Sequence, residues 1–150
     1  MKIRPYVDKD YAFILEIYHN SKLDELRFEE KRFELLPLEK DAIRYAKLME
    51  SDIYVYDDNG IRGYCAVYGS EIRALYVDPA RRGLGIGRRM LMFLLDRIAG
   101  PAELSVARSN APAIGLYQKH GFKIVDEFET RYNGEPVMAV KMARSMDAIR

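Results

Sequence analysis

Hydrophobic and polar residues alternate through the middle of the chain in short segments that are typical of β-strands. The segments Ile53–Tyr56, Ile61–Tyr68 and Glu71–Val77 are rich in β-branched and aromatic residues, and the turn-forming segments Asp57–Gly60 and Gly69–Ser70 separate them. The Asn-Gly pair in the first connection readily supplies the positive φ angles of a two-residue hairpin turn. The pattern therefore predicts an antiparallel meander of three strands.

A different pattern, in which apolar residues recur every three or four positions, predicts four helices. They run from Asp8 to a break at Asn20-Ser21, from Pro37 to Met49, from Ile86 to Ile98, and from Asn110, as the capping residue, to His120-Gly121. The spacing selects the following residues of the first two helices as core-facing: Phe13, Ile14, Ile17, Tyr18, Leu38, Ala42, Ile43, Ala46 and Met49.

Four further segments have the composition of strands: Lys2–Tyr6, Glu103–Ala107, Phe122–Phe128 and Val137–Met142. The helix between Glu71–Val77 and Glu103–Ala107 makes a long crossover, which implies that these two strands are parallel. The fold class is therefore α+β, with a mixed, mostly antiparallel sheet of about six or seven strands and about four helices. The charged segment Lys22–Leu36 fits either a helix or a loop with a solvated face, and the tail Ala143–Arg150 looks frayed or weakly helical.

Composition fits one folded domain over residues 1–150. The chain is 49% hydrophobic and 31% charged, which is typical of a globular domain of this length. Its formal net charge of +1 gives no basic surface for nucleic acid, and no apolar run has the length of a membrane span or the character of a signal peptide. Cys65 is the only cysteine, which excludes an internal disulfide and fits a reducing compartment. We therefore expect a cytoplasmic protein.

The segment between the third strand of the meander and the next helix changes character. Two arginines and then three glycines at alternate positions precede the apolar helix. Glycine lets backbone N–H groups approach a ligand closely, and the first N–H groups of a helix have no internal partner and attract anions. The spacing G-x-G-x-G fits neither the dinucleotide fingerprint nor the nucleotide P-loop. We expect a diphosphate cradle formed by the N–H groups of Gly83, Gly85, Ile86, Gly87 and Arg88.

Two blocks of the sequence resemble the GNAT N-acetyltransferase superfamily. The block Arg82–Gly87 matches the family's acetyl-CoA signature [QR]-x-x-G-x-[GA], and Val77-Asp78-Pro79 is similar to the usual lead-in. The block Asn110–Phe122 meets every fixed position of N-x-x-A-x-x-[LF]-Y-x-[KR]-x-G-F. The resemblance implies the GNAT fold, with two parallel strands splayed at the cofactor cleft, and acetyl-CoA as acetyl donor. The implied acceptor is an amine, which leaves open a small molecule, a protein N-terminus and a lysine.

The resemblance also implies roles for individual residues. The pantetheine arm pairs with the edge Leu75–Val77, and the Leu75 N–H donates to the developing oxyanion. Tyr117 is the general acid, and Asn110 touches the arm or positions its helix. In the family, the region between the first two helices, here Lys22–Leu36, shapes the acceptor groove. The full expected cofactor-binding set is Leu75, Tyr76, Val77, Arg82, Gly83, Leu84, Gly85, Ile86, Gly87, Arg88, Asn110 and Tyr117.

The base that removes the amine proton stays open between three candidates. Glu71 falls where the histone-acetyltransferase branch has its catalytic glutamate, and it also fits a solvated strand end. The ribosomal-protein branch places a glutamate on the strand after the helix, but the matching residue here is Ser105, with Glu103 on the same face by strand alternation. Water is the third candidate, because some family members have no dedicated base.

Direct attack in a ternary complex is the expected mechanism. Cys65 lies in an apolar strand without a cationic neighbour in sequence, so we interpret it as a core residue rather than an acetyl carrier. His19 and His120 are interpreted as structural, and we expect no metal site. The expected partners are acetyl-CoA and a small-molecule or peptide amine, with the chain acting as a monomer or homodimer. The alternative is a non-catalytic acyl-CoA-binding sensor or interaction module.

Overall fold

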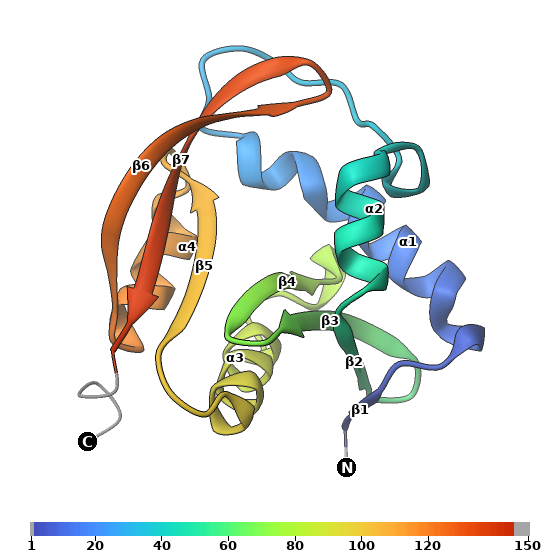
Figure 1. Ribbon diagram of the computed structural model, residues 1–150. Coiled ribbons are helices and arrows are strands. Elements are labelled where there is room, and N and C mark those ends of the chain that lie inside the picture. The colour runs from blue at the N-terminus through green and yellow to red at the C-terminus, as the bar shows by residue number, and fades with distance from the viewer. Residues whose placement is uncertain (1, 146–150) are drawn as a thin grey trace.

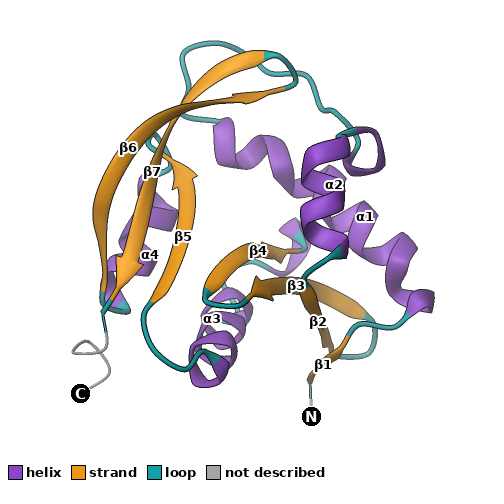
Figure 2. Ribbon diagram, viewed as in Figure 1, coloured by secondary structure: helices purple, strands orange, loops and turns teal. Residues whose placement is uncertain are grey.

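The computed structural model describes residues 2–145 and contains a seven-stranded sheet with four α-helices in that range (Figures 1 and 2). The strands are β1 (Ile3–Pro5), β2 (Asp52–Asp57), β3 (Ile61–Tyr68), β4 (Glu71–Val77), β5 (Ala102–Ala107), β6 (Phe122–Tyr132) and β7 (Glu135–Arg144). The helices are α1 (Tyr11–Ser21), α2 (Ala42–Met49), α3 (Ile86–Arg97) and α4 (Ala111–Lys119). Five of the six strand pairs are antiparallel and one, β4 with β5, is parallel, so the expected mixed, mostly antiparallel α+β sheet is confirmed.

The meander β2–β3–β4 forms as predicted, with both connections antiparallel. Asn59 and Gly60 at the first turn have φ angles of 55° and 126°. A second turn of the same chemistry, Asn133-Gly134, joins β6 to β7 with φ angles of 50° and 80°. Short Asn-Gly connections therefore set the register of both hairpins.

The two parallel strands β4 and β5 meet at one end only. In the sheet order β1-β2-β3-β4-β5-β7-β6, they are paired at the single register Glu71–Glu103. Figure 1 shows β4 and β5 separating from that point, so that the sheet opens between its two halves. The backbone edge of β4 beyond Glu71 is therefore available to a ligand.

Helices cover both faces of the sheet. On one face, α3 buries Met90, Leu91 and Leu94 completely against β3, β4 and β5 in one large apolar cluster, and side chains of α4 pack against the same cluster. On the other face, α1 buries Ile14 and Ile17 in a second cluster. Each of these side chains contributes about 1.5–3 kcal/mol through burial, so the two clusters hold the cleft walls in place.

The prediction of which residues of the first two helices face the core is partly wrong. Phe13 is 51% exposed and Ile43 is 73% exposed, and Ala42, Ala46 and Met49 also face solvent. The second helix begins only at Ala42, because Asp41 is its N-cap and accepts a hydrogen bond from the Arg44 N–H. The short helix therefore buries Leu48, on the face opposite to the one that the longer predicted helix selected.

The boundaries also differ at three places. The first helix does not break at Asn20-Ser21 but continues into a 3-10 helix, η2 (Lys22–Leu26), which resolves part of the unassigned charged segment. Strand β6 extends to Tyr132, four residues beyond the expected end. Ala143 and Arg144 belong to β7 rather than to a tail, and residues 146–150 lie outside the described part of the chain.

A third apolar cluster ties η2 and the loop after it to the tip of the β6–β7 hairpin. Leu26, Tyr132 and Val137 form its buried centre. The Tyr132 hydroxyl accepts a hydrogen bond from the Leu36 N–H at 2.7 Å and donates to the Leu36 carbonyl at 3.2 Å. This packing holds the charged segment over the opening between β4 and β5 (Figure 2).

Candidate active site

A cleft of about 1000 Å³ follows the opening between β4 and β5. Its walls come from α1, η2, α2, the end of β4, the start of α3, β5, α4 and the β6–β7 hairpin. The residues that sequence analysis singled out and that line this cleft are Glu71, Leu75, Tyr76, Val77, Arg82, Gly83, Gly85, Ile86, Gly87, Asn110 and Tyr117. Leu84 and Arg88 are not among the lining residues, and the Leu84 side chain is 58% exposed.

The glycine segment presents backbone rather than side chains at one end of the cleft. Gly83 and Gly85 both have φ angles of 81°, and Gly85 is the N-cap of α3 without a side-chain capping hydrogen bond. The first N–H groups of α3 are therefore open to an anion. Arg82, at the same end, forms an ion pair with Asp24 of η2.

Strand β4 offers hydrogen-bonding groups along the cleft. The Asp78 N–H donates to the Arg62 carbonyl at 2.8 Å, so alternation along the antiparallel pair turns the N–H groups of Leu75 and Val77 away from β3. The Ser21 hydroxyl donates to the Val77 carbonyl at 3.2 Å, which agrees with this orientation. The β4 edge thus carries outward N–H donors at Leu75 and Val77.

Helix α4 places Tyr117 and Asn110 on the opposite wall. Burial, followed by the charge of Glu25, raises the pKa of Tyr117 well above its ordinary value, so the phenol stays protonated at neutral pH. Its ring packs edge-on against Phe122, with the ring centroids 5.8 Å apart. Asn110 occupies the N-cap position and is only 7% exposed, but the expected side-chain cap is wrong because its amide makes no capping hydrogen bond.

The candidate bases differ in position. Glu71 lines the cleft and forms an ion pair with Arg73 in which the Oε1–Nε distance is 2.5 Å. Glu103 is not among the lining residues and pairs with Lys141 at 3.2 Å, whereas Ser105 does line the cleft. The geometry therefore brings Glu71, but not Glu103, to the same cavity as Tyr117.

Tyr18, Lys22 and Glu25 also line the cleft. The sequence gives Tyr18 as a core-facing residue and places Lys22 and Glu25 in the segment that the family resemblance assigns to the acceptor groove, but it gives none of the three an individual role. The spacing of four and three residues between them continues the periodicity of α1 and would have placed them on one side. That signal was hidden by the helix break expected at Asn20-Ser21.

The side chains interpreted as structural do not join the cleft. Cys65 is fully buried, and burial raises the pKa of its thiol to about 12, so the thiolate is scarce at neutral pH. His120 bonds through Nδ1 to the Leu116 carbonyl oxygen at 2.9 Å. Within residues 2–145, no group of three or more His, Cys, Asp or Glu side chains has the arrangement of a metal site. In the same range, no helix combines the length and apolar character that a membrane crossing needs.

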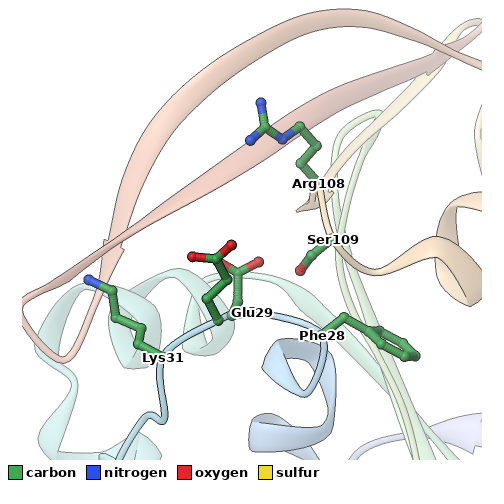
Figure 3. A pocket seen from close by; sticks show the side chains of 6 residues that line it. Phe28, Glu29, Lys31, Arg108 and Ser109 are labelled. Carbon is green, nitrogen blue, oxygen red and sulfur yellow. The ribbon is translucent and has the colours of Figure 1, made fainter.

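A smaller hollow of about 550 Å³ lies between the loop after η2 and the connection from β5 to α4. Figure 3 shows Lys31 and Arg108 on either side of Glu29 at its rim. Both cations are already engaged, because Lys31 pairs with Glu135 and Arg108 with Glu127. This surface hollow shares no lining residue with the larger cleft, which remains the candidate active site.

Comparison with known proteins agrees with this geometry. A family model described as an acetyltransferase (GNAT) domain matches residues 49–124. The peptidyl-lysine N-acetyltransferase YjaB of Salmonella typhimurium is 32% identical over 105 residues, which is 70% of each chain.

Two solved structures share the fold. A GCN5-related N-acetyltransferase from Rhodopseudomonas palustris superposes with a TM-score of 0.78 at 19% identity, over 96% of this chain and 94% of that one. The structure of yncA from Salmonella typhimurium, solved with its cofactor acetyl-CoA, has a TM-score of 0.69 at 22% identity, over 98% and 94%. The glycine cradle, the splayed strands and these matches together show that the chain belongs to the GNAT family of acetyl-CoA-dependent N-acetyltransferases.

Proposed function

We propose that this enzyme transfers the acetyl group of acetyl-CoA to the Nε amine of a lysine side chain, by direct attack in a ternary complex. The observation that carries the proposal is the single cleft that joins the glycine cradle, the open β4 edge and Tyr117. The lysine acceptor is supported by the peptidyl-lysine relative, whose match spans 70% of this chain.

The chain's own groups fit acetyl-CoA. The open N–H groups at the start of α3, together with Arg82, suit the diphosphate. The Leu75–Val77 edge suits an extended pantetheine arm, and Asn110, whose side-chain amide makes no capping hydrogen bond, supplies a further polar group along it. Acetyl-CoA contributes the activated acyl group, and the protein contributes position, charge and proton transfer.

The proposed reaction forms one C–N bond and breaks one C–S bond. The neutral amine attacks the thioester carbonyl carbon, and the Leu75 N–H donates to the oxygen on which charge develops. The nitrogen then loses its proton to Glu71, directly or through a water, while Tyr117 donates to the departing sulfur. Before attack, the lysine ammonium loses one proton to water; after the reaction, Glu71 releases its proton to solvent and Tyr117 regains one, so the cycle closes with the net release of one proton.

The choice of base is tested by a pair of matched variants. We expect Glu71→Gln to lower kcat/KM for the amine by about tenfold or more, because the carboxylate that accepts the nitrogen's proton is replaced by an amide. Glu103→Gln serves as the control, because that carboxylate lies outside the cleft. Equal activity of both variants and the unmodified enzyme would assign proton removal to water alone.

The function itself is tested by measuring CoA release with an amine panel. The panel contains a lysine peptide blocked at its N-terminus, the same peptide with norleucine in place of lysine, a peptide with a free N-terminus, and spermidine. We expect CoA release and a mass increase of one acetyl group with the blocked lysine peptide but not with its norleucine match. Tight acetyl-CoA binding without transfer to any amine would instead identify a non-catalytic acyl-CoA-binding module.

A further inference from the structure

We propose that Glu25 and Tyr18 form the site that holds the acceptor's ammonium group, with Glu25 as its charged ligand. This inference rests on the proposed function and names the part of the cleft that recognises the amine. It also limits the acceptor to a primary amine with a single positive charge near its reacting end.

The Glu25 carboxylate already binds a primary ammonium group. Lys22 Nζ lies 2.9 Å from Glu25 Oε2, and it stands 5.9 Å from the ring centroid of Tyr18 and 5.3 Å from that of Tyr132. The Lys22 side chain is only 10% exposed and that of Glu25 is 32% exposed. An ammonium group that is held by a carboxylate and faces aromatic rings is stabilised both by the charge-assisted hydrogen bond and by cation–π attraction.

Glu25 faces the proposed reaction centre as well as Lys22. Its charge acts on the pKa of Tyr117 from α4 and of Tyr76 from β4, and all three side chains line the cleft. Glu25, Tyr76 and Tyr117 therefore line the same cavity as Lys22, so an acceptor bound to the Glu25 carboxylate shares that cavity with Leu75 and Tyr117.

Tyr18 provides an independent indication of a ligand. The residue is only 3% exposed, and its hydroxyl is buried without a hydrogen-bond partner among the described residues. After burial, the groups that act on its pKa include Tyr132, Arg44 and Glu25, which all line the cleft. A buried hydroxyl is costly to leave unpaired, so a hydrogen bond to an acceptor substrate explains why it is kept there.

The cleft lining carries eight Lys and Arg side chains against four Asp and Glu side chains, which disfavours a polycation even though Arg44 pairs with Asp41 and Arg73 with Glu71 and Glu50. Arg44 stands 5.2 Å from the centroid of the same Tyr132 ring that Lys22 faces, and Lys47, Arg73 and Arg131 also line the cleft. A polyamine would bring its second and third positive charges beside these cations, which costs free energy. A lysine side chain, with one charge and an uncharged backbone, avoids this repulsion.

The first test is calorimetric binding of Nα-acetyl-lysine amide to the CoA-loaded protein, which needs no turnover. We expect Glu25→Gln to weaken binding by about tenfold or more, since a hydrogen bond between two charged groups is lost. Lys22→Met should strengthen binding, because it removes a competing ammonium and keeps the volume. Glu16→Gln, on the exposed face of α1, is the matched control and should bind as the unmodified protein does.

Opposite signs for the two variants separate recognition from a structural role. If the Lys22–Glu25 pair only stabilises η2, both variants lower the melting temperature and both weaken binding, and the inference is overturned. Unchanged binding by Glu25→Gln also overturns it.

Two further readouts complete the test. Tyr18→Phe should weaken acceptor binding about threefold to tenfold while the melting temperature holds or rises, because an unpaired buried hydroxyl is removed. Spermine should bind more weakly than Nα-acetyl-lysine amide, and tighter spermine binding would contradict the monocation assignment. Failure of acetyl transfer with normal, Glu25-dependent binding would refute the proposed function and leave this inference standing.

Discussion

The proposed donor end and the proposed acceptor end of the cleft are built from different kinds of sequence. The donor end consists of the last residues of β4 and the glycine segment before α3, which are nearly consecutive in the chain. The acceptor end is assembled from α1, η2, α2 and the β6–β7 hairpin, whose residues meet only through packing. One end is thus a property of local backbone, and the other is a property of tertiary contacts.

This difference has a consequence for how each end tolerates change. N–H groups at a helix start point the same way whatever their side chains are, provided that glycine allows the backbone path. Tyr18, Lys22 and Glu25, in contrast, would act through their side chains, and Tyr18 also packs edge-on against Tyr76 of β4 with the ring centroids 5.4 Å apart.

The largest expected effect comes from breaking the donor end at Gly85. A β-branched side chain at its φ angle of 81° is strained by about 1–3 kcal/mol and forces the loop to move. We expect Gly85→Val to weaken acetyl-CoA binding by about 100-fold, measured by calorimetry. Gly69→Val is the control, because Gly69 also has a positive φ, of 62°, but lies outside the cleft. Equal loss in both variants would trace the effect to general destabilisation.

The next largest effect is expected at Tyr117, where a substitution should change the rate of acetyl transfer but not the affinity for acetyl-CoA. Tyr117→Phe should lower kcat by about 100-fold, the range of general acid catalysis, and leave the Kd for acetyl-CoA within about twofold. Tyr54→Phe, on β2 and outside the cleft, controls for the loss of a phenol. Wild-type turnover in the Tyr117 variant would remove this residue from the mechanism.

The pH profile checks the same role from the other side. Because burial raises the pKa of Tyr117 above the ordinary value of about 10, its acidic form persists as pH rises through that value. We therefore expect no decline of kcat between about pH 8 and pH 10. A falling limb in that window that is absent from the Tyr117→Phe variant would contradict a raised pKa.

A smaller effect is expected from the ion pair between Asp24 and Arg82, which connects η2 to the glycine segment. Their side chains are 41% and 45% exposed, and exposed ion pairs contribute about 0.2–1 kcal/mol. Asp24→Asn should release Arg82 for the diphosphate and tighten acetyl-CoA binding by about twofold to fivefold, most clearly at low salt. Glu135→Gln, which breaks the exposed pair with Lys31, should leave that affinity unchanged. Weaker binding by Asp24→Asn would show that the pair supports the donor end instead.

The smallest effect is expected at Cys65. Since burial raises the pKa of its thiol to about 12, iodoacetamide should not modify the folded protein, whereas the unfolded chain should react. Cys65→Ala should retain turnover and lose only about 1 kcal/mol of stability in denaturant unfolding. Detection of an acetylated cysteine by mass spectrometry would point to a covalent intermediate.

Sequence alone predicted the elements whose signals are local. The Asn59-Gly60 turn, the parallel crossover from β4 to β5 and the start of α3 directly after the glycine segment all appear as expected, whereas binding of a diphosphate at that helix start stays a prediction. The prediction of which helix faces are buried was partly wrong. In α2, Ile43 is exposed and Leu48 is buried, because the Asp41 cap and the packing against the sheet set the orientation of the helix, which periodicity alone does not specify.

The sequence by itself determined the backbone of the proposed donor end, because glycines with positive φ angles at a helix start leave its first N–H groups open wherever the helix lies. Only the tertiary structure decided which side chains line the proposed acceptor end. It turned a segment with the composition of a solvated face inward, because Leu26 docks against Tyr132 and Val137 on the β6–β7 hairpin. This docking joins segments that are about a hundred residues apart in the chain. It places Glu25 and Tyr18 in the cleft lining, which no local sequence pattern specifies.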